Sequence, residues 1–80
     1  KLPYPEKEAE KRELAEKLNE TLEKLSERER LVIRLYYYEE LSFVEIAEVL
    51  NVSQPRVSQL HTRALDKMRP NMGKYMELFV

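Results

Sequence analysis

Residues Leu41 to Leu65 read LSFVEIAEVLNVSQPRVSQLHTRAL, and this segment predicts two short helices joined by a tight turn. Ser42 is a candidate N-cap, and Glu45 follows three residues later, which is the spacing of a capping box. Behind this cap, apolar residues recur at helical spacing and predict a helix of about two turns with one buried face. These residues are Phe43, Ile46, Ala47 and Leu50.

The turn and the start of the second helix are also marked in the sequence. Asn51 tolerates the left-handed backbone conformation that ends many helices, and Val52 supplies an apolar contact beneath the corner. Ser53 is a candidate N-cap for the next helix, and Pro55 lies in its first turn, where a missing N–H does no harm. The order of helix, turn and helix predicts a helix-turn-helix, a motif whose second helix lies in the major groove of DNA.

The second helix of this motif divides into an apolar and a polar face when successive residues are placed about 100° apart. The apolar stripe consists of Val57, Leu60, Ala64 and Met68, with His61 inside it. The opposite face carries Pro55, Ser58, Gln59 and Thr62, with Arg56 and Arg63 on one flank and Gln54 at the leading end. A helix that was merely solvated would carry Glu and Lys on this face, as the rest of the chain does. The polar face therefore favours DNA reading.

The composition predicts a single all-α domain. The chain has 80 residues, of which 42% are hydrophobic and 36% charged, and it contains one glycine. We expect a small four-helix domain with a C-terminal helix-turn-helix and room for a short extra helix in the tail. The sequence contains no run of about eighteen apolar residues, so no membrane span is expected. The lack of cysteine fits a reducing cytoplasm. Because the chain begins with Lys1 rather than Met, we expect it to be a segment of a longer protein.

Two further helices are predicted upstream of the motif. After a lead-in at residues 1–5, a first helix over residues 6–25 has an apolar stripe of Leu14, Leu18, Leu22 and Leu25. A second helix over residues 27–39 begins at a capping box made by Ser26 and Glu29. Because this second helix is apolar on most sides, we expect it to lie in the centre of the bundle.

The C-terminal boundary of the motif is predicted from proline. We expect the helix-turn-helix to span residues 42–69, because Pro70 bars continuation of a helix. The tail, residues 71–80, is apolar at helical spacing. Two interpretations of this tail stay open: it folds back onto the bundle, or it binds another protein.

The charge is unevenly distributed along the chain. The net charge of the whole chain is −1, but residues 51–80 carry five basic and two acidic side chains, a net charge of +3. Phosphate contacts need local basic charge rather than a basic chain. We therefore expect weak DNA binding by this segment alone, and stronger binding when a larger assembly holds it beside DNA.

Catalytic and metal chemistry are not expected. His61 is the only histidine, cysteine is absent and no glycine-rich phosphate loop is present. The single imidazole is predicted to pack in the seam between helices, and no thiolate or second imidazole could share a metal. We predict no catalytic residues, no metal site and no cofactor.

The stretch from Leu25 to Arg69, LSERERLVIRLYYYEELSFVEIAEVLNVSQPRVSQLHTRALDKMR, closely resembles region 4 of bacterial RNA polymerase sigma factors. Within it, SQPRVSQLHTRAL is similar to the flagellar and motility branch. The resemblance implies a cytoplasmic bacterial domain that recognises double-stranded promoter DNA at the upstream (−35) element. It also implies that the other side of the domain grips the β-subunit flap of core RNA polymerase.

The resemblance also assigns residues to partners. By position, the base contacts fall on Gln54, Pro55, Ser58 and Gln59. The contacts to the DNA backbone fall on Ser53, Arg56, Thr62 and Arg63. Relatives often carry charged residues at the first two base-facing positions, so readout here is expected to rest on Gln59 with adenine and Pro55 with a thymine methyl. Sigma factors of this branch are bound by an anti-sigma factor, for which the candidate residues are Tyr36, Tyr37, Tyr38, Tyr75 and Phe79.

Two alternative functions share this fold. One is a stand-alone helix-turn-helix transcriptional regulator, which would dimerise and bind two half-sites. The other is a protein-interaction module that has lost DNA binding, an interpretation motivated by the small positive charge and by Gln54 and Pro55.

Overall fold

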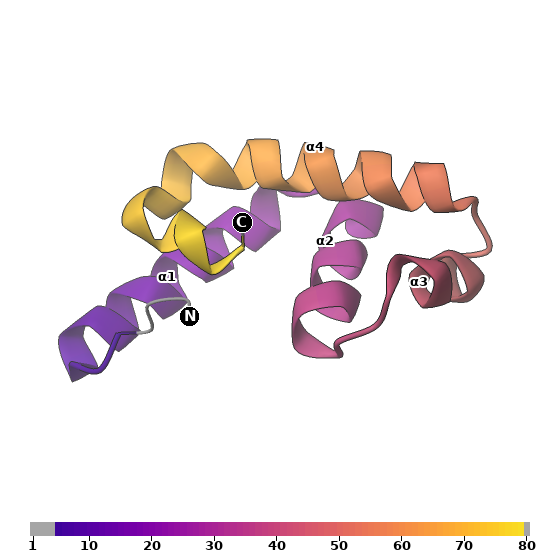
Figure 1. Cartoon of the computed structure of the whole chain (residues 1–80). Helices are drawn as coiled ribbons and strands as arrows, with labels where there is room; N and C mark the ends of the chain where they lie inside the picture. Colours follow the sequence, from indigo (N-terminus) through magenta and orange to yellow (C-terminus); the bar gives the residue numbers. More distant parts are fainter. Residues whose placement is uncertain (1–4, 80) are drawn as a thin grey trace.

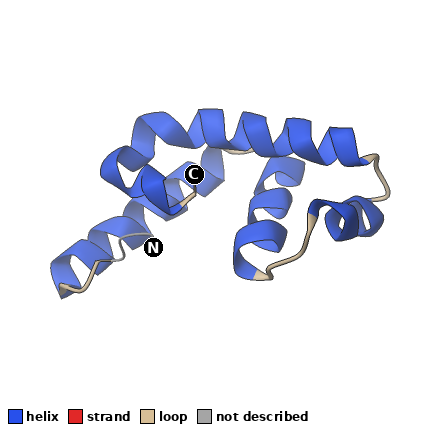
Figure 2. Ribbon diagram, viewed as in Figure 1, coloured by secondary structure: helices blue, strands red, loops and turns tan. Residues whose placement is uncertain are grey.

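A long helix, α4, runs along one side of the computed structural model, which describes residues 5–79 (Figure 1). The elements in chain order are α1 (Glu8–Lys24), α2 (Glu27–Ile33), the π-helical turn η1 (Arg34–Tyr38), α3 (Phe43–Leu50), α4 (Gln54–Met72) and the 3-10 helix η2 (Gly73–Leu78). Within the described residues the chain forms helices joined by loops and no strand (Figure 2). The expected all-α fold is confirmed. No helix in this part of the chain combines the length and the apolar character that a bilayer span requires.

Two apolar clusters lie beneath α4, one under each half of it. The first cluster, under the C-terminal half, consists of Leu14, Leu22, Leu25, Ile33, Ala64, Met68, Met72, Tyr75, Met76 and Phe79. The second cluster, under the N-terminal half, consists of Val32, Ile46, Ala47, Val57 and Leu60. Figure 1 shows the same division, with α1 and η2 under one half of α4 and α3 under the other.

The second helix, α2, lies between these two clusters. Its neighbouring residues Val32 and Ile33 are both completely buried, and they pack into different clusters. The expectation that this helix is central in the bundle is therefore confirmed. Arg30 joins α2 to the end of α1. Its guanidinium donates from Nε to the Leu22 carbonyl at 2.9 Å and from Nη2 to the Leu25 carbonyl at 3.1 Å. These bonds cap the last carbonyls of α1.

A buried carboxylate joins the start of α2 to α4. The predicted capping box is present: Ser26 N donates to Glu29 Oε1 at 2.9 Å, and Glu29 N donates to Ser26 Oγ at 3.2 Å. Glu29 is only 3% exposed, and the same Oε1 accepts from Lys67 Nζ at 2.8 Å. Burial alone would raise the pKa of Glu29, but the Lys67 and Ser26 bonds outweigh it, so the pKa is lowered from its ordinary value of 4.5.

The second helix does not end as an α-helix. Residues Arg34–Tyr38 widen into a π-helical turn, closed by a bond from Glu39 N to Arg34 O at 3.1 Å. The spacing of apolar residues in the sequence does not predict this change from an α-helix to a π-helical turn. The wide turn allows the adjacent residues Tyr36 and Tyr37 to contact the same side chain, His61, with ring centroids 5.4 and 5.7 Å away.

The predicted end of the helix-turn-helix at residue 69 is wrong. Helix α4 continues through Pro70 to Met72, which is completely buried. Proline removes the N–H that would bond to the carbonyl of residue 66, but Asp66 is exposed, so water can satisfy that carbonyl. The chain instead turns at Gly73, whose φ of +55° suits glycine.

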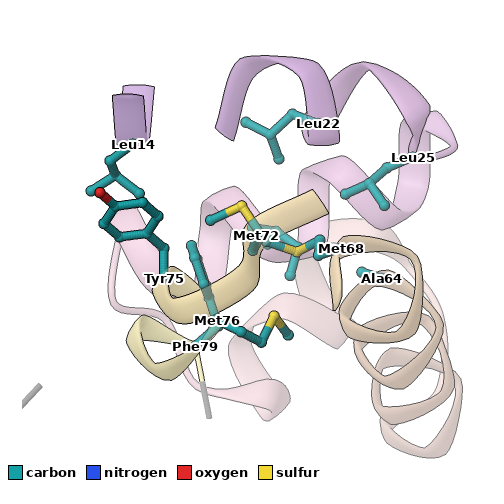
Figure 3. Packing of buried hydrophobic residues seen from close by; sticks show 10 residues of the cluster. Leu14, Leu22, Leu25, Ala64, Met68, Met72, Tyr75, Met76 and Phe79 are labelled. Carbon is teal, nitrogen blue, oxygen red and sulfur yellow. The ribbon is translucent and has the colours of Figure 1, made fainter. Parts of the chain in front are cut away.

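The tail folds back onto the bundle. Of the two interpretations of residues 71–80, the first therefore holds for residues 71–79, and Val80 lies outside the described residues. Figure 3 shows Tyr75 beside Leu14, and Met76 and Phe79 lie in the same cluster as Met68 and Met72. Tyr75 also donates its hydroxyl to Glu13 Oε1 at 2.9 Å, and Lys74 pairs with Glu10 at 3.6 Å. Residues 1–4, the predicted lead-in up to Pro5, also lie outside the described residues.

The Glu29–Lys67 pair predicts a pH-dependent stability. A carboxylate whose pKa is lowered by folding adds stability above its unfolded pKa, and this stability is lost as the pH falls through the lowered value. We expect Glu29→Gln to keep the capping box but to reduce the unfolding free energy by about 1 kcal/mol at neutral pH. The difference from the unmodified chain should shrink below about pH 4.5, measured by urea unfolding across a pH series.

Glu45→Gln is the matched control. Glu45 makes the same capping box with Ser42, at 2.8 and 3.2 Å, on the surface of α3. Its substitution should change stability by much less. An equal, pH-independent loss in both variants would show that Lys67 adds nothing to the fold.

Candidate nucleic-acid interface

The turn between α3 and α4 has the geometry that its residues predict. Asn51 ends α3 in the left-handed conformation, with φ 56° and ψ 49°. Val52 N then donates to Ala47 O at 3.0 Å, which satisfies a terminal carbonyl of α3. Ser53 Oγ accepts from Arg56 N at 3.2 Å and so caps α4 as expected. Small Ala47 is buried where the two helices meet.

The predicted division of α4 into two faces is confirmed. Its apolar stripe is buried, with Val57, Ala64 and Met68 completely inaccessible and Leu60 nearly so. The residues assigned to base edges, Gln54, Pro55, Ser58 and Gln59, are all exposed. Of those assigned to the DNA backbone, Ser53, Thr62 and Arg63 are exposed and Arg56 is partly buried. The fold therefore gathers all eight side chains at the N-cap and in the first three turns of one helix. We call these eight residues the reading face.

One contact within the reading face sets the orientation of a side chain. Arg56 Nη1 donates to Gln59 Oε1 at 3.3 Å. This bond uses one lone pair of the amide oxygen and leaves both amide N–H groups able to donate. Gln59 can therefore still donate from both amide N–H groups and accept through the remaining lone pair of its oxygen.

The charge around the reading face favours an anion. The first turn of α4 contains no acidic residue, and its N-terminus carries the positive end of the helix dipole. Asp66 lies further along and pairs with Arg69 at 3.8 Å. Arg56 and Arg63 thus place two positive charges beside the exposed polar side chains. In the described part of the chain, no three acidic or imidazole side chains gather closely enough to hold a metal ion.

The residues assigned to a protein partner divide into two groups. Tyr36 and Tyr38 are exposed, by 37% and 50%, and Tyr37 is partly buried. Tyr75 and Phe79 are instead core residues, exposed by only 6% and 8%. The structure thus corrects the placement of these two rings on a partner surface, because the folded-back tail uses them to cover the first cluster.

A cluster of aromatic residues around His61 was not foreseen in full. His61 was expected in the seam and is half-buried there, with Tyr36, Tyr37 and Phe43 as ring neighbours at 5.3 to 5.7 Å. Tyr37 Oη lies 2.8 Å from His61 Nε2 and 2.7 Å from the carbonyl oxygen of Phe79. These partners are 24 and 42 residues away in sequence, so local spacing gives no signal for them.

An exposed, acid-free polar helix face held by a capped tight turn defines a helix-turn-helix domain of the DNA-binding class. Comparison with known families gives the particular type. The family described as sigma-70, region 4 matches residues 21–70. The chain belongs to this sigma-70 region 4 family.

Individual relatives agree with this assignment. The chain is 49% identical to RNA polymerase sigma factor FliA of Escherichia coli (strain K12) over 61 residues, which are 76% of this chain and 26% of that protein. It is 44% identical to the RNA polymerase sigma-D factor of Bacillus subtilis (strain 168) over 73 residues, 91% of this chain and 29% of that protein. It is 50% identical to FliA of Pseudomonas aeruginosa (strain PAO1) over 58 residues, 72% of this chain and 24% of that protein.

These matches confirm the expected likeness to the flagellar and motility branch. The chain spans about a quarter of the length of these curated relatives. No solved structure matches it significantly.

The left-handed turn residue predicts a stability difference. We expect Asn51→Ala to lower the unfolding free energy by about 1 kcal/mol, because a Cβ without a polar side chain is disfavoured at positive φ. Asn51→Gly should stay within about 0.5 kcal/mol of the unmodified chain. Thermal unfolding followed by circular dichroism would measure both.

Asn19→Ala serves as the control, because Asn19 lies exposed within α1, where alanine favours the helix. That substitution should be neutral or stabilising. If Asn51→Ala behaved in the same way, the turn would not depend on the left-handed conformation.

Proposed function

We propose that this chain is the promoter-reading domain of a bacterial sigma factor, and that α4 enters the major groove at the upstream (−35) element. The observation that carries the proposal is the reading face itself. Seven of its eight side chains are exposed and Arg56 is partly buried, while the opposite stripe, from Val57 to Met68, is fixed in two cores. A helix held in this way keeps its base-facing residues in one orientation, as direct readout requires. Sequence-specific binding would then direct core RNA polymerase to the promoter in the bacterial cytoplasm.

The reading face divides by chemistry into two roles. Base edges can be met by four side chains of different chemistry. These are the amides of Gln54 and Gln59, the hydroxyl of Ser58 and the apolar ring of Pro55. Phosphate oxygens suit the other four residues. Ser53 and Thr62 offer hydroxyl groups, and Arg56 and Arg63 offer positive charges. With only two arginines in this set, the electrostatic part of binding is small. Binding by the isolated chain should therefore be weak and strongly dependent on salt.

Substitution of Gln59 tests the base-reading role. We expect Gln59→Ala to lose about 1–3 kcal/mol of binding at one base pair and to relax the preference there, because one bidentate contact disappears. Competition binding of polymerase holoenzyme to promoter fragments, each changed at a single −35 position, would measure this. A uniform loss on every fragment would contradict a base contact.

Substitution of Arg63 tests the phosphate role. We expect Arg63→Ala to weaken binding to all fragments alike and to reduce the slope of log affinity against log salt by about one. Arg12→Ala, on exposed α1 and outside the reading face, is the matched control. Promoter binding that showed no salt dependence with the unmodified chain would favour an interaction module that has lost DNA binding.

The proposal extends to protein partners on the other side of the domain. Tyr38 and the partly buried Tyr37 border a groove of about 510 Å³ that lies between α1, η1 and the tail. Its lining residues are Lys11, Leu14, Ala15, Leu18, Tyr37, Tyr38, Leu78 and Phe79. None of these belongs to the reading face. We therefore assign this side to the polymerase β-flap and to an anti-sigma factor, with Tyr36 and Tyr38 as the exposed contacts.

Capture from a bacterial lysate would test these partners. The tagged chain should retain core polymerase and an anti-sigma factor, and Tyr38→Glu should reduce capture of the anti-sigma factor by about tenfold, because a charge would be buried against an apolar surface. Val49→Glu is the control, since Val49 is an apolar residue on α3 that is at least as exposed as Tyr38 and does not line the groove. Equal capture by both variants would remove the tyrosines from the partner surface.

A further inference from the structure

The hydroxyl of Tyr37 lies where three parts of the chain meet. Tyr37 belongs to the π-helical turn η1, His61 to α4 and Phe79 to the end of the tail. The Tyr37 and Phe79 rings also pack edge to face, with centroids 5.0 Å apart. A single oxygen atom thus contacts both the helix that carries the reading face and the tail that closes the first cluster.

Counting protons fixes the direction of both hydrogen bonds. Burial, with a smaller contribution from Tyr36, raises the pKa of Tyr37 to about 12, so its hydroxyl keeps its one proton. The Phe79 carbonyl can only accept, so Tyr37 donates that proton to it. The 2.8 Å contact with His61 is then a hydrogen bond only if Nε2 carries a proton and donates to the Tyr37 oxygen.

The state of His61 follows from this direction. Burial lowers the pKa of His61, which favours the neutral ring with one proton. That proton must lie on Nε2, and Nδ1 is left without one. If the Phe79 carbonyl moved away, the Tyr37 hydroxyl could turn and donate to Nε2 instead. The proton of His61 would then move to Nδ1. The tautomer of His61 therefore reports whether the tail is docked.

His61 lies in the seam where α4 meets its neighbours. Its ring lies among Tyr36 and Tyr37 of η1 and Phe43 of α3, between the buried residues Leu60 and Ala64. Because α4 is one rigid helix, a rotation at His61 would turn Ser58, Gln59 and Thr62 by the same angle. A hydrogen bond at His61 therefore acts on the direction of the reading face.

We propose that Tyr37 is a positioning residue that couples docking of the tail to the orientation of the reading face. While Phe79 is docked, the Tyr37 oxygen accepts the hydrogen bond from His61 Nε2, and α4 keeps its position against η1 and α3. Displacement of the tail, which a protein covering the first cluster would cause, reverses the Tyr37–His61 hydrogen bond and removes the tail residues that pack against α4. The part of this proposal that concerns DNA affinity rests on the proposed function. The coupling within the chain does not.

Nuclear magnetic resonance of the ¹⁵N-labelled 80-residue chain tests the coupling directly. We expect the Nε2–H tautomer of His61 near neutral pH. Tyr37→Phe should shift the backbone amide resonances of residues 58–63 and speed hydrogen exchange at the Phe79 amide, which donates to Met76 O at 2.9 Å. Tyr36→Phe is the matched control, because it removes a hydroxyl from another ring that packs against the same imidazole and should leave the tautomer unchanged.

A second variant guards against misfolding of Tyr37→Phe. A chain ending at Leu78 keeps Tyr37 but lacks the Phe79 acceptor, so a substantial Nδ1–H population should develop at His61. An Nδ1–H tautomer or a charged His61 in the unmodified chain at neutral pH would overturn the proposal. Retention of pure Nε2–H in the shortened chain would also overturn it.

Promoter binding by holoenzyme separates this proposal from the proposed function. Tyr37→Phe should weaken binding about two- to tenfold on all −35 variants that the unmodified protein recognises, the effect of one or two hydrogen bonds. Unchanged affinity with a displaced tail would overturn the link to DNA. If the unmodified holoenzyme showed no −35 preference, the proposed function would fail, and the tautomer and amide shifts would still decide whether Tyr37 couples tail and helix.

Discussion

The buried stripe of α4 is the constraint on which the domain depends. Val57, Leu60, Ala64, Met68 and Met72 follow one another at intervals of three or four residues, and each is buried. Because such intervals keep side chains on one side of a helix, burying this stripe determines which side chains remain outside. The polar reading face is thus a consequence of the core. One of its residues also stabilises the helix, because Ser53 caps the first turn of α4.

Division of the stripe between two clusters explains why so small a chain holds a long helix rigidly. Val57 and Leu60 belong to the cluster with α3, whereas Ala64, Met68 and Met72 belong to the cluster with α1 and the tail. Helix α2 contributes Val32 to one cluster and Ile33 to the other. A helix anchored at only one end could pivot, but α4 is anchored in both cores. The tail therefore completes a core that the reading face requires, although in Figure 1 it lies near the opposite end of α4 from the first turns of that helix.

The local parts of this architecture could be predicted from the sequence, and the non-local parts could not. Both capping boxes, the left-handed Asn51 and the two faces of α4 follow from side chains within four residues of one another, where helical geometry alone decides the contact. The end of α4 differs from the prediction because Pro70 favours a stop at residue 69, whereas Met72 continues the buried stripe one turn beyond Met68. The π-helical turn, the Glu29–Lys67 pair and the Tyr37 bonds depend on contacts between distant elements. Sequence spacing contains no information about these contacts.

The distribution of charge matches this mechanical arrangement. Helix α1 is covered with mixed charges, whereas the first three turns of α4 carry arginine and no acid. Acidic residues near the reading face would repel phosphate, and further basic residues would raise affinity for any DNA sequence alike. A domain with few charges and a rigid polar face gains little from non-specific attraction. With two arginines beside exposed uncharged side chains, the reading face offers an anion more hydrogen-bonding groups than net charge.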